Sequence, residues 1–289
     1  MAGENNMGRE IRHKGGAALV YRFIMYIVFG IITFLTIYPL LWLVLSSLKT
    51  TQAFQMDRLG LPNPIFLKNY PLAWKIGHFD ILFSNSVFYT VTTTIAVLVF
   101  SFAASFAFAK IPSRFTGFLH GSFIIGILLT LQSIMVPLFL MTNAVGLYNT
   151  RLGILIPYIG IGLPMGIYLG TEYIKSIPDA LIESARIEGA GYLRIFFSII
   201  APMTKPVAMT LAIISFTGIW NEFMLINILA SKEAIKSLPV GILKFSGALA
   251  TDYGKQFAAL SIGMAPMLAF YALFHKQITQ GVSAGAVKG

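Results

Sequence analysis

The chain has 289 residues, of which 56% are hydrophobic and only 11% are charged, whereas an ordinary soluble domain carries about 25% charged residues. A mean hydropathy of +0.77 leaves too little polar surface to face water, which argues against a soluble enzyme and indicates an integral membrane protein. The formal net charge is +10, but no basic cluster with stacking aromatics accompanies it, so nucleic acid is not an expected partner. The chain has no Cys and its four His are far apart, so no metal site is expected.

Six apolar windows are long enough to cross a bilayer, because a transmembrane helix needs about 20 mostly apolar residues. In chain order these windows are 23–48, 81–109, 115–150, 152–171, 206–231 and 256–274. The third holds one long span and its exit loop, and Glu222 interrupts the fifth. The sequence therefore predicts an all-α integral membrane protein with six transmembrane helices and only loops outside the membrane.

The loops predict the topology. An even number of spans places both termini on one side, where 12 Lys and Arg lie against 9 on the other, so the positive-inside rule weakly favours cytoplasmic termini. We expect a cytoplasmic N-terminal segment at 1–16, a six-span permease domain at 17–275 and a cytoplasmic tail at 276–289. The first apolar run is longer than a signal-peptide core and no cleavage motif follows it, so we expect it to be retained.

The fourth span carries Gly162, Gly166 and Gly170 at intervals of four residues, a pattern that lets two membrane helices approach closely. Pro157 and Pro164 interrupt the same helix. The pattern predicts tight packing with a kink, and a kink that shapes a translocation path is the alternative.

The cytoplasmic loop at 172–205 contains a short amphipathic helix. Pro178 suits its first turn, the helix dipole favours Asp179 beside it, and Gly189 is a natural stop. Three apolar residues share one face, namely Leu181, Ile182 and Ala185. A helix this short is not stable alone, so we expect it to dock against another surface. From composition alone, an interfacial connector is an equally good interpretation.

This loop resembles the signature Glu-Ala-Ala-x3-Gly-x9-Ile-x-Leu-Pro of the permeases of binding-protein-dependent ABC importers. The matching residues are Glu183, Ser184, Ala185, Gly189, Ile199 and Pro202. Two positions depart from the signature, because Ser184 replaces its first Ala and Ala201 replaces its Leu. Both are small or apolar exchanges, so they affect the strength of docking rather than the resemblance to the family.

Further stretches are similar to the maltose-type carbohydrate branch of these permeases, and within it to the alginate-type oligosaccharide importers. They are Asn85-Ser86, Trp220-Asn221-Glu222-Phe223 and the C-terminal residues 281–289. The similarity covers most of the chain and implies the six-span second subunit of a heterodimeric pair.

The resemblance implies ATP chemistry in other chains. No G-x-x-x-x-G-K-[ST] loop occurs in the sequence, so this chain is not expected to be an enzyme or to hold a cofactor. The implied partners are a second permease subunit, two ATP-binding subunits that carry ATP and Mg, an extracytoplasmic solute-binding protein and an oligosaccharide. The implied location is the lipid of a bacterial inner membrane.

In the family, the short helix sits in a groove of the ATP-binding subunit and couples ATP binding to movement of the membrane helices. By resemblance, Glu183 would pair with a basic groove residue, Ala185 would provide a close fit and Gly189 the turn, and Pro202 would set the angle into the fifth span. The tail around Ala284 would reach towards the ATP-binding subunits, and an end without regular structure is the alternative.

Candidate solute contacts are polar residues inside the spans. A charge there is costly, so Glu222 either caps or pairs within the bundle or lies beside the solute path with Asn221. The other candidates are Gln132, Tyr168 and Asn227, although such residues also serve as packing contacts. The basic excess of the outward loops suits an anionic solute, an acidic binding protein or anionic lipid.

A secondary carrier or channel not driven by ATP is the alternative function. A channel would need a filter-like run of carbonyls or a charged ring, which we do not find between adjacent spans. A proton-coupled carrier would need paired intramembrane carboxylates or inverted repeats, whereas Glu222 is alone. An intramembrane metalloenzyme would need a motif such as H-E-x-x-H, which is absent.

Overall fold

The computed structural model describes the backbone of residues 4–245 and 252–286, with side chains described for 21–245 and 252–276. Within these ranges the regular elements are all helical, as predicted. In chain order they are α1 (Glu4–Ser47), α2 (Thr51–Met56), α3 (Asn69–Ile76), α4 (Phe79–Lys110), α5 (Thr116–Ile127), α6 (Leu131–Ala144), α7 (Arg151–Lys175), α8 (Asp179–Ile187), α9 (Tyr192–Ile195), the π-helix η1 (Phe196–Ile200), α10 (Ala201–Met203), α11 (Lys205–Asn221), α12 (Met224–Leu229), the 3₁₀ turn η2 (Glu233–Ile235), α13 (Leu238–Ile242), the 3₁₀ turn η3 (Leu243–Phe245) and α14 (Tyr253–Ala286).

Four of the described helices, α1, α4, α7 and α14, are each long and apolar enough to cross a membrane. Two bent pairs bring the number to six if each is one span: α5 with α6, bent by 109°, and the α9–α10 segment with α11, bent by 75°. The third window, predicted to hold one long span and its exit loop, is divided into α5 and α6, because the chain turns between Ile127 and Leu131. The fifth window is also displaced, since its helix starts before residue 206 and ends at Asn221.

Helices α4 and α7 pack closely, and their contact explains the spaced glycines. A Cβ atom on Gly162 would lie 2.6 Å from a methyl of Val97, and one on Gly166 would lie 2.2 Å from the hydroxyl of Ser101. One on Gly170 would lie 2.5 Å from the hydroxyl of Ser105. The predicted close approach is therefore confirmed, and α7 continues as one helix through both of its prolines.

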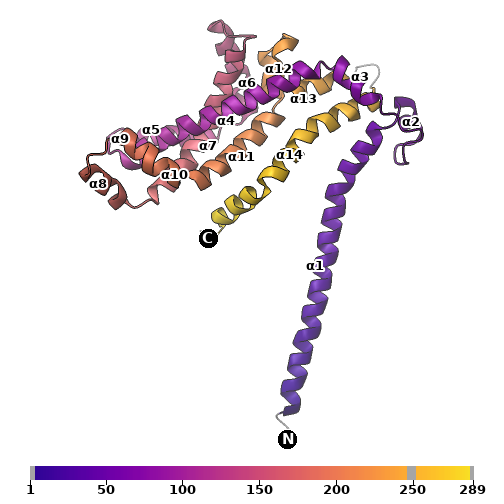
Figure 1. Cartoon of the computed structure of the whole chain (residues 1–289), viewed down its shortest axis with the longest axis horizontal. Coiled ribbons are helices and arrows are strands. Elements are labelled where there is room, and N and C mark those ends of the chain that lie inside the picture. Colours follow the sequence, from indigo (N-terminus) through magenta and orange to yellow (C-terminus); the bar gives the residue numbers. More distant parts are fainter. Residues whose placement is uncertain (1–3, 246–251, 287–289) are drawn as a thin grey trace.

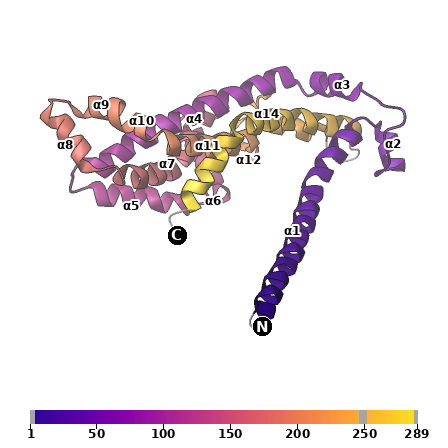
Figure 2. The same cartoon turned by 60° about the horizontal axis from the view of Figure 1, so that its bottom comes forward.

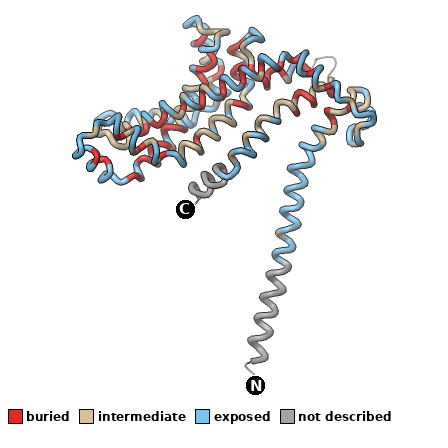
Figure 3. The backbone as a smooth tube through the Cα atoms, in the orientation of Figure 1, coloured by how far each residue is buried: buried red, intermediate tan, exposed pale blue. Residues whose placement is uncertain are grey.

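Helix α1 stands apart from the bundle and meets it only at its C-terminal end (Figure 1). No residue of its most apolar window is buried, and residues 21–41 are exposed except for the half-buried Met25 (Figure 3). Its end is fixed by the buried Asn69, whose amide donates to the carbonyls of Ser47 at 2.8 Å and Lys49 at 2.7 Å.

The two ends of the chain are helical where their backbone is described. α1 begins at Glu4, so the polar N-terminal segment continues directly into the first span. α14 continues to Ala286, so the alternative of an irregular tail does not hold for 276–286. Residues 287–289 of the predicted tail lie outside the described residues.

Candidate functional site: a docking helix and the helices behind it

The short helix α8 has the ends that its sequence predicts. It begins at Asp179, after Pro178, and its C-terminal end is closed by Gly189 at a φ of +83°. The amide of Gly189 donates to the carbonyl of Arg186 at 3.0 Å, and the amide of Ala190 donates to that of Ala185 at 2.9 Å. These two bonds form a Schellman motif, which explains why a glycine occupies this position.

One face of α8 is buried and the other is free. Ile182 and Ala185 are 7% and 9% exposed and belong to an apolar cluster with Phe102 and Ile174 of α4 and α7. Glu183 is exposed, as is Ser184, whose hydroxyl donates to its own helix. Leu181, predicted on the apolar face, is 44% exposed. The exposed face can therefore contact another protein while the buried face holds the helix on the bundle.

The remaining signature residues lie in the bent segment after α8. Ile199 is half-buried in η1 beside the same apolar cluster, and Pro202 is exposed in α10. The 75° bend comes at Thr204, between Pro202 and Pro206, rather than at Pro202 itself. Pro206 suits the first turn of α11 because its missing N–H would have no partner there.

Lys110, the last residue of α4, meets the start of α8. Its ammonium donates to the carbonyl of Ile177 and to the carboxylate of Asp179, each at 2.6 Å. The Lys110 side chain is 4% exposed and that of Asp179 is 75% exposed. Both residues line a hollow of about 810 Å³, which Arg114 and Glu183 also line. The sequence pattern gave no signal for this pairing, because the two residues lie far apart in the chain.

Glu222 caps and pairs within the bundle, one of the two roles considered for it. It follows α11 with extended backbone, and its carboxylate accepts the amides of Leu225 at 2.7 Å and Ile226 at 3.3 Å and the hydroxyl of Tyr158. Glu222 and Tyr158 line a cavity of about 270 Å³ with otherwise largely apolar walls. Sequence reasoning missed Tyr158, although a Tyr in mid-span signals the need for a polar partner.

The other proposed solute contacts do not converge in the single chain. Asn221 lines a different cavity, of about 520 Å³, and its amide donates to the carbonyl of Thr217. Neither of these two cavities is lined by Gln132, Tyr168 or Asn227, all three of which are exposed.

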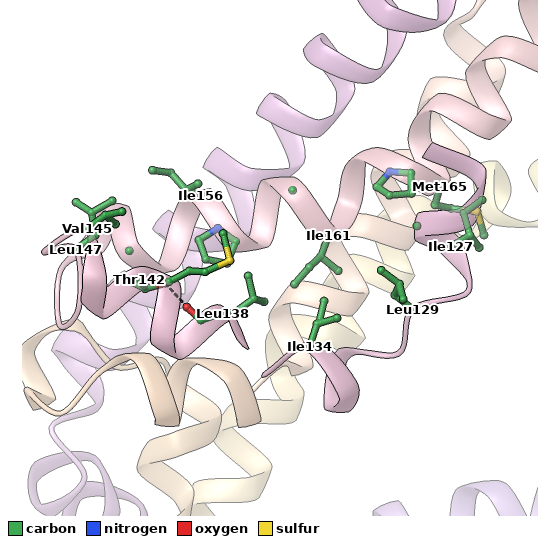
Figure 4. A pocket seen from close by; sticks show the side chains of 16 residues that line it. Ile127, Leu129, Ile134, Leu138, Thr142, Val145, Leu147, Ile156, Ile161 and Met165 are labelled. Carbon is green, nitrogen blue, oxygen red and sulfur yellow. Dashed lines mark hydrogen bonds between the residues drawn. The ribbon is translucent and has the colours of Figure 1, made fainter. Parts of the chain in front are cut away.

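A cavity of about 590 Å³ lies between α7 and the broken pair α5–α6 (Figure 4). Its walls are apolar except for Thr142, whose hydroxyl donates to the carbonyl of Leu138 at 2.7 Å. A sugar requires several hydroxyl partners, so this cavity does not have the chemistry of a sugar site.

The N-terminal end of α4 holds the segment between α12 and α13. The amide of Asn85 donates to the carbonyls of Ala234 at 2.8 Å and Lys236 at 3.0 Å, and the hydroxyl of Tyr89 donates to that of Ile235 at 2.8 Å. The amide of Leu238 donates to the hydroxyl of Ser86 at 2.8 Å. These contacts give Asn85-Ser86, noted in the sequence, a definite structural role.

A helical bundle with several apolar helices long enough to cross a membrane, and with one short helix exposed on one face, fits a membrane permease. Residues 102–283 match the family described as binding-protein-dependent transport system inner membrane component. The chain belongs to this family, and it is a permease subunit of an ABC importer, embedded in the inner membrane as a multi-pass protein. Family membership also implies work with other components of the importer and with a solute-binding protein.

Similar proteins agree with this assignment. The probable ABC transporter permease protein YurM of Bacillus subtilis is 33% identical over 252 residues, covering 87% of this chain and 84% of that protein. The multiple sugar-binding transport system permease protein MsmG of Streptococcus mutans is 36% identical over 274 residues, covering 93% of this chain and 96% of that protein. A chain of a bacterial ABC transporter involved in the import of the acidic polysaccharide alginate has a similar fold, with a TM-score of 0.78 and 23% identity. The similarity covers 89% of this chain and 96% of that chain.

Proposed function

We propose that this permease subunit imports oligosaccharides, acidic ones such as alginate fragments among them, and that ATP hydrolysis in two separate subunits drives the transport. The observation that carries the proposal is the free face of α8, on which Glu183 and Ser184 stay exposed while Ile182 and Ala185 hold the helix to the bundle. ATP and Mg belong to those subunits, and this chain contributes no catalytic residue.

The docking contacts follow from this arrangement. Glu183 pairs with a basic residue of the ATP-binding subunit, and the Schellman turn at Gly189 lets the chain leave the interface sharply. Ser184, Ala185, Ile199 and Pro202 belong to the same docking loop, 172–205. Closure of the two ATP-binding subunits then displaces α8 and changes the access of the solute path.

The second permease is required to complete the path. The apolar length of α1 is uncovered in the single chain, and so are Gln132, Tyr168, Asn221 and Asn227. We place a heterologous permease against part of these surfaces and lipid against the rest. The exposed amides of Gln132, Asn221 and Asn227 are suited to bind sugar hydroxyls, whereas Glu222 already has partners of its own.

The orientation follows from the docking helix. With α8 in the cytoplasm, the opposite end of α4 faces outward, together with the basic residues Lys232, Lys236 and Lys244. Both termini are then cytoplasmic, at 1–16 and 276–289. The outward basic residues favour an acidic solute or an acidic face of the binding protein.

The test is purification of the tagged chain from its native membrane in mild detergent, with partners identified by mass spectrometry and ATPase activity assayed on the same sample. We expect a second permease and an ATP-binding subunit in stoichiometric amounts, and Glu183→Lys should lose the ATP-binding subunit. Recovery of the chain alone, without ATPase activity, would contradict the proposal and favour an ATP-independent carrier or channel.

A further inference from the structure

The short helix α8 is attached to the bundle at its start by Lys110 of α4. α8 has nine residues and is joined to its neighbours by short turns on both sides. After it, the chain bends by 75° at Thr204 before α11 begins. Before α8, residues 177–179 are bonded to α4 by the buried ammonium group of Lys110.

The contact between Lys110 and the start of α8 is suited to transmit force. One ammonium bridges a carbonyl at Ile177 and a carboxylate at Asp179, both at 2.6 Å, and its side chain is 4% exposed. Charge-assisted hydrogen bonds are short and directional, and burial limits competition from water. Ile177 itself is 4% exposed within the apolar cluster behind α8. The beginning of α8 therefore cannot move away from the end of α4 without breaking both bonds.

α4 is suited to carry the displacement further. It is a single helix of 32 residues without an internal proline, which corresponds to about 48 Å at 1.5 Å per residue. Figures 1 and 2 show it running along the bundle from α3 to the neighbourhood of α8 and α9. The glycine face of α7 lies against it, and the hydroxyl of Ser105 donates to the carbonyl of Ile167 at 3.1 Å.

The other end of α4 holds the outward segment 234–238 through Asn85, Ser86 and Tyr89. We propose that Lys110 is a positioning residue that makes α4 the lever between the docking helix and this outward segment. This inference rests on the proposed docking of an ATP-binding subunit at α8. Displacement of α8 then moves residues 234–238 with α4.

The test uses the full transporter complex with spin labels at Ala234→Cys and Leu59→Cys, both exposed positions outside the spans. The natural chain has no Cys, which leaves these two positions as its labelling sites. Distances are measured with and without Mg-ATP and vanadate, and ATPase activity is assayed in parallel. The variant is Lys110→Met, which keeps most of the apolar stem of the side chain.

The matched control is Lys175→Met. Lys175 forms a 2.8 Å ion pair with Glu172 of its own helix and joins no two elements, and its side chain is 49% exposed. We expect Lys110→Met to retain assembly and ATPase activity but to reduce the ATP-induced shifted population by about fivefold or more, a usual size for coupling between sites. Lys175→Met should behave as the parent, and Lys110→Arg should restore most of the shift.

An unchanged shift in Lys110→Met would overturn the proposal, as would the absence of a shift at residue 234 in a parent complex that hydrolyses ATP. If Lys110→Met does not assemble, the same distances are measured in Asp179→Asn. This variant keeps the bond from Lys110 to Ile177 and weakens only the bond to the exposed side chain of residue 179. An ATP-induced shift equal to that of the parent in Asp179→Asn overturns the proposal. Failure of the parent chain to bind any ATP-binding subunit would instead contradict the proposed function.

Discussion

Gly166 of α7 lies so close to Ser101 of α4 that a Cβ atom on residue 166 would be 2.2 Å from the serine hydroxyl oxygen and 2.7 Å from its Cβ. Leu211 of α11 would be 3.0 Å away on another side. Three helices therefore meet at one point where only a hydrogen atom fits.

The first prediction concerns this contact. Gly166→Ala should separate α4 from α7 and lower the free energy of unfolding by about 1–3 kcal/mol, the usual cost of overpacking a core. The measurement is the unfolding midpoint of the purified complex in an SDS titration. Gly160→Ala is the matched control on the same helix, because nothing lies within 4 Å of its added Cβ atom. Equal midpoints for the two variants would contradict the packing argument.

The second prediction concerns the end of α8. Gly189 has a φ of +83° and no atom within 4 Å of an added Cβ, so only backbone strain opposes a substitution. Gly189→Val should cost about 1–2 kcal/mol or displace the turn, and it should reduce binding of the ATP-binding subunit while the protein remains inserted. Gly189→Asn should be milder, because Asn tolerates the left-handed region. The amount of ATP-binding subunit that co-purifies with each variant measures this binding. Equal amounts for Gly189→Val and Gly189→Asn would refute a role for the backbone conformation of residue 189.

The third prediction separates the two roles considered for Glu222. Glu222→Gln can still accept the amide of Leu225 and bond Tyr158, whereas Glu222→Leu leaves these groups without their partner. We expect Glu222→Leu to lower the free energy of unfolding by about 1–3 kcal/mol for each buried group left unsatisfied. Thermal stability in detergent measures this, with Tyr158→Phe as a milder companion. A Glu222→Leu protein as stable as Glu222→Gln would contradict the capping role and favour a position of Glu222 beside the solute path.

The fourth prediction concerns the attachment of α1. Asn69→Leu removes both amide bonds to the carbonyls of Ser47 and Lys49 at a site that is 3% exposed. α1 should become more mobile relative to the bundle, which a spin label at Tyr38→Cys would report as a narrower spectrum. Asn227→Leu, at an exposed amide, is the control. An unchanged spectrum for Asn69→Leu would mean that other contacts fix this helix.

Local features of the fold follow from the sequence because their causes are local. The limits of α8 depend on Pro178, Asp179 and Gly189, each of which acts on its own turn of backbone, and the structure reproduces them. The glycine spacing on α7 required a close helix neighbour, and α4 is that neighbour. The break at 128–130 was not predicted, since an apolar window reports only solvent and length, and a bent helix pair satisfies it as well as a straight one. The end of α11 at Asn221 was not predicted for the same reason.

The sequence by itself determined that this protein crosses the membrane several times, that it carries the loop signature of importer permeases and that it has no G-x-x-x-x-G-K-[ST] motif, because composition and short motifs express these properties directly. Only the tertiary structure decided that Glu222 is bound by Tyr158 and its own backbone, that Lys110 holds Asp179 and that Asn85 holds the segment 234–236. Each of these pairings joins residues distant in the chain. Their distances depend on how the helices pack, and no local pattern contains that information.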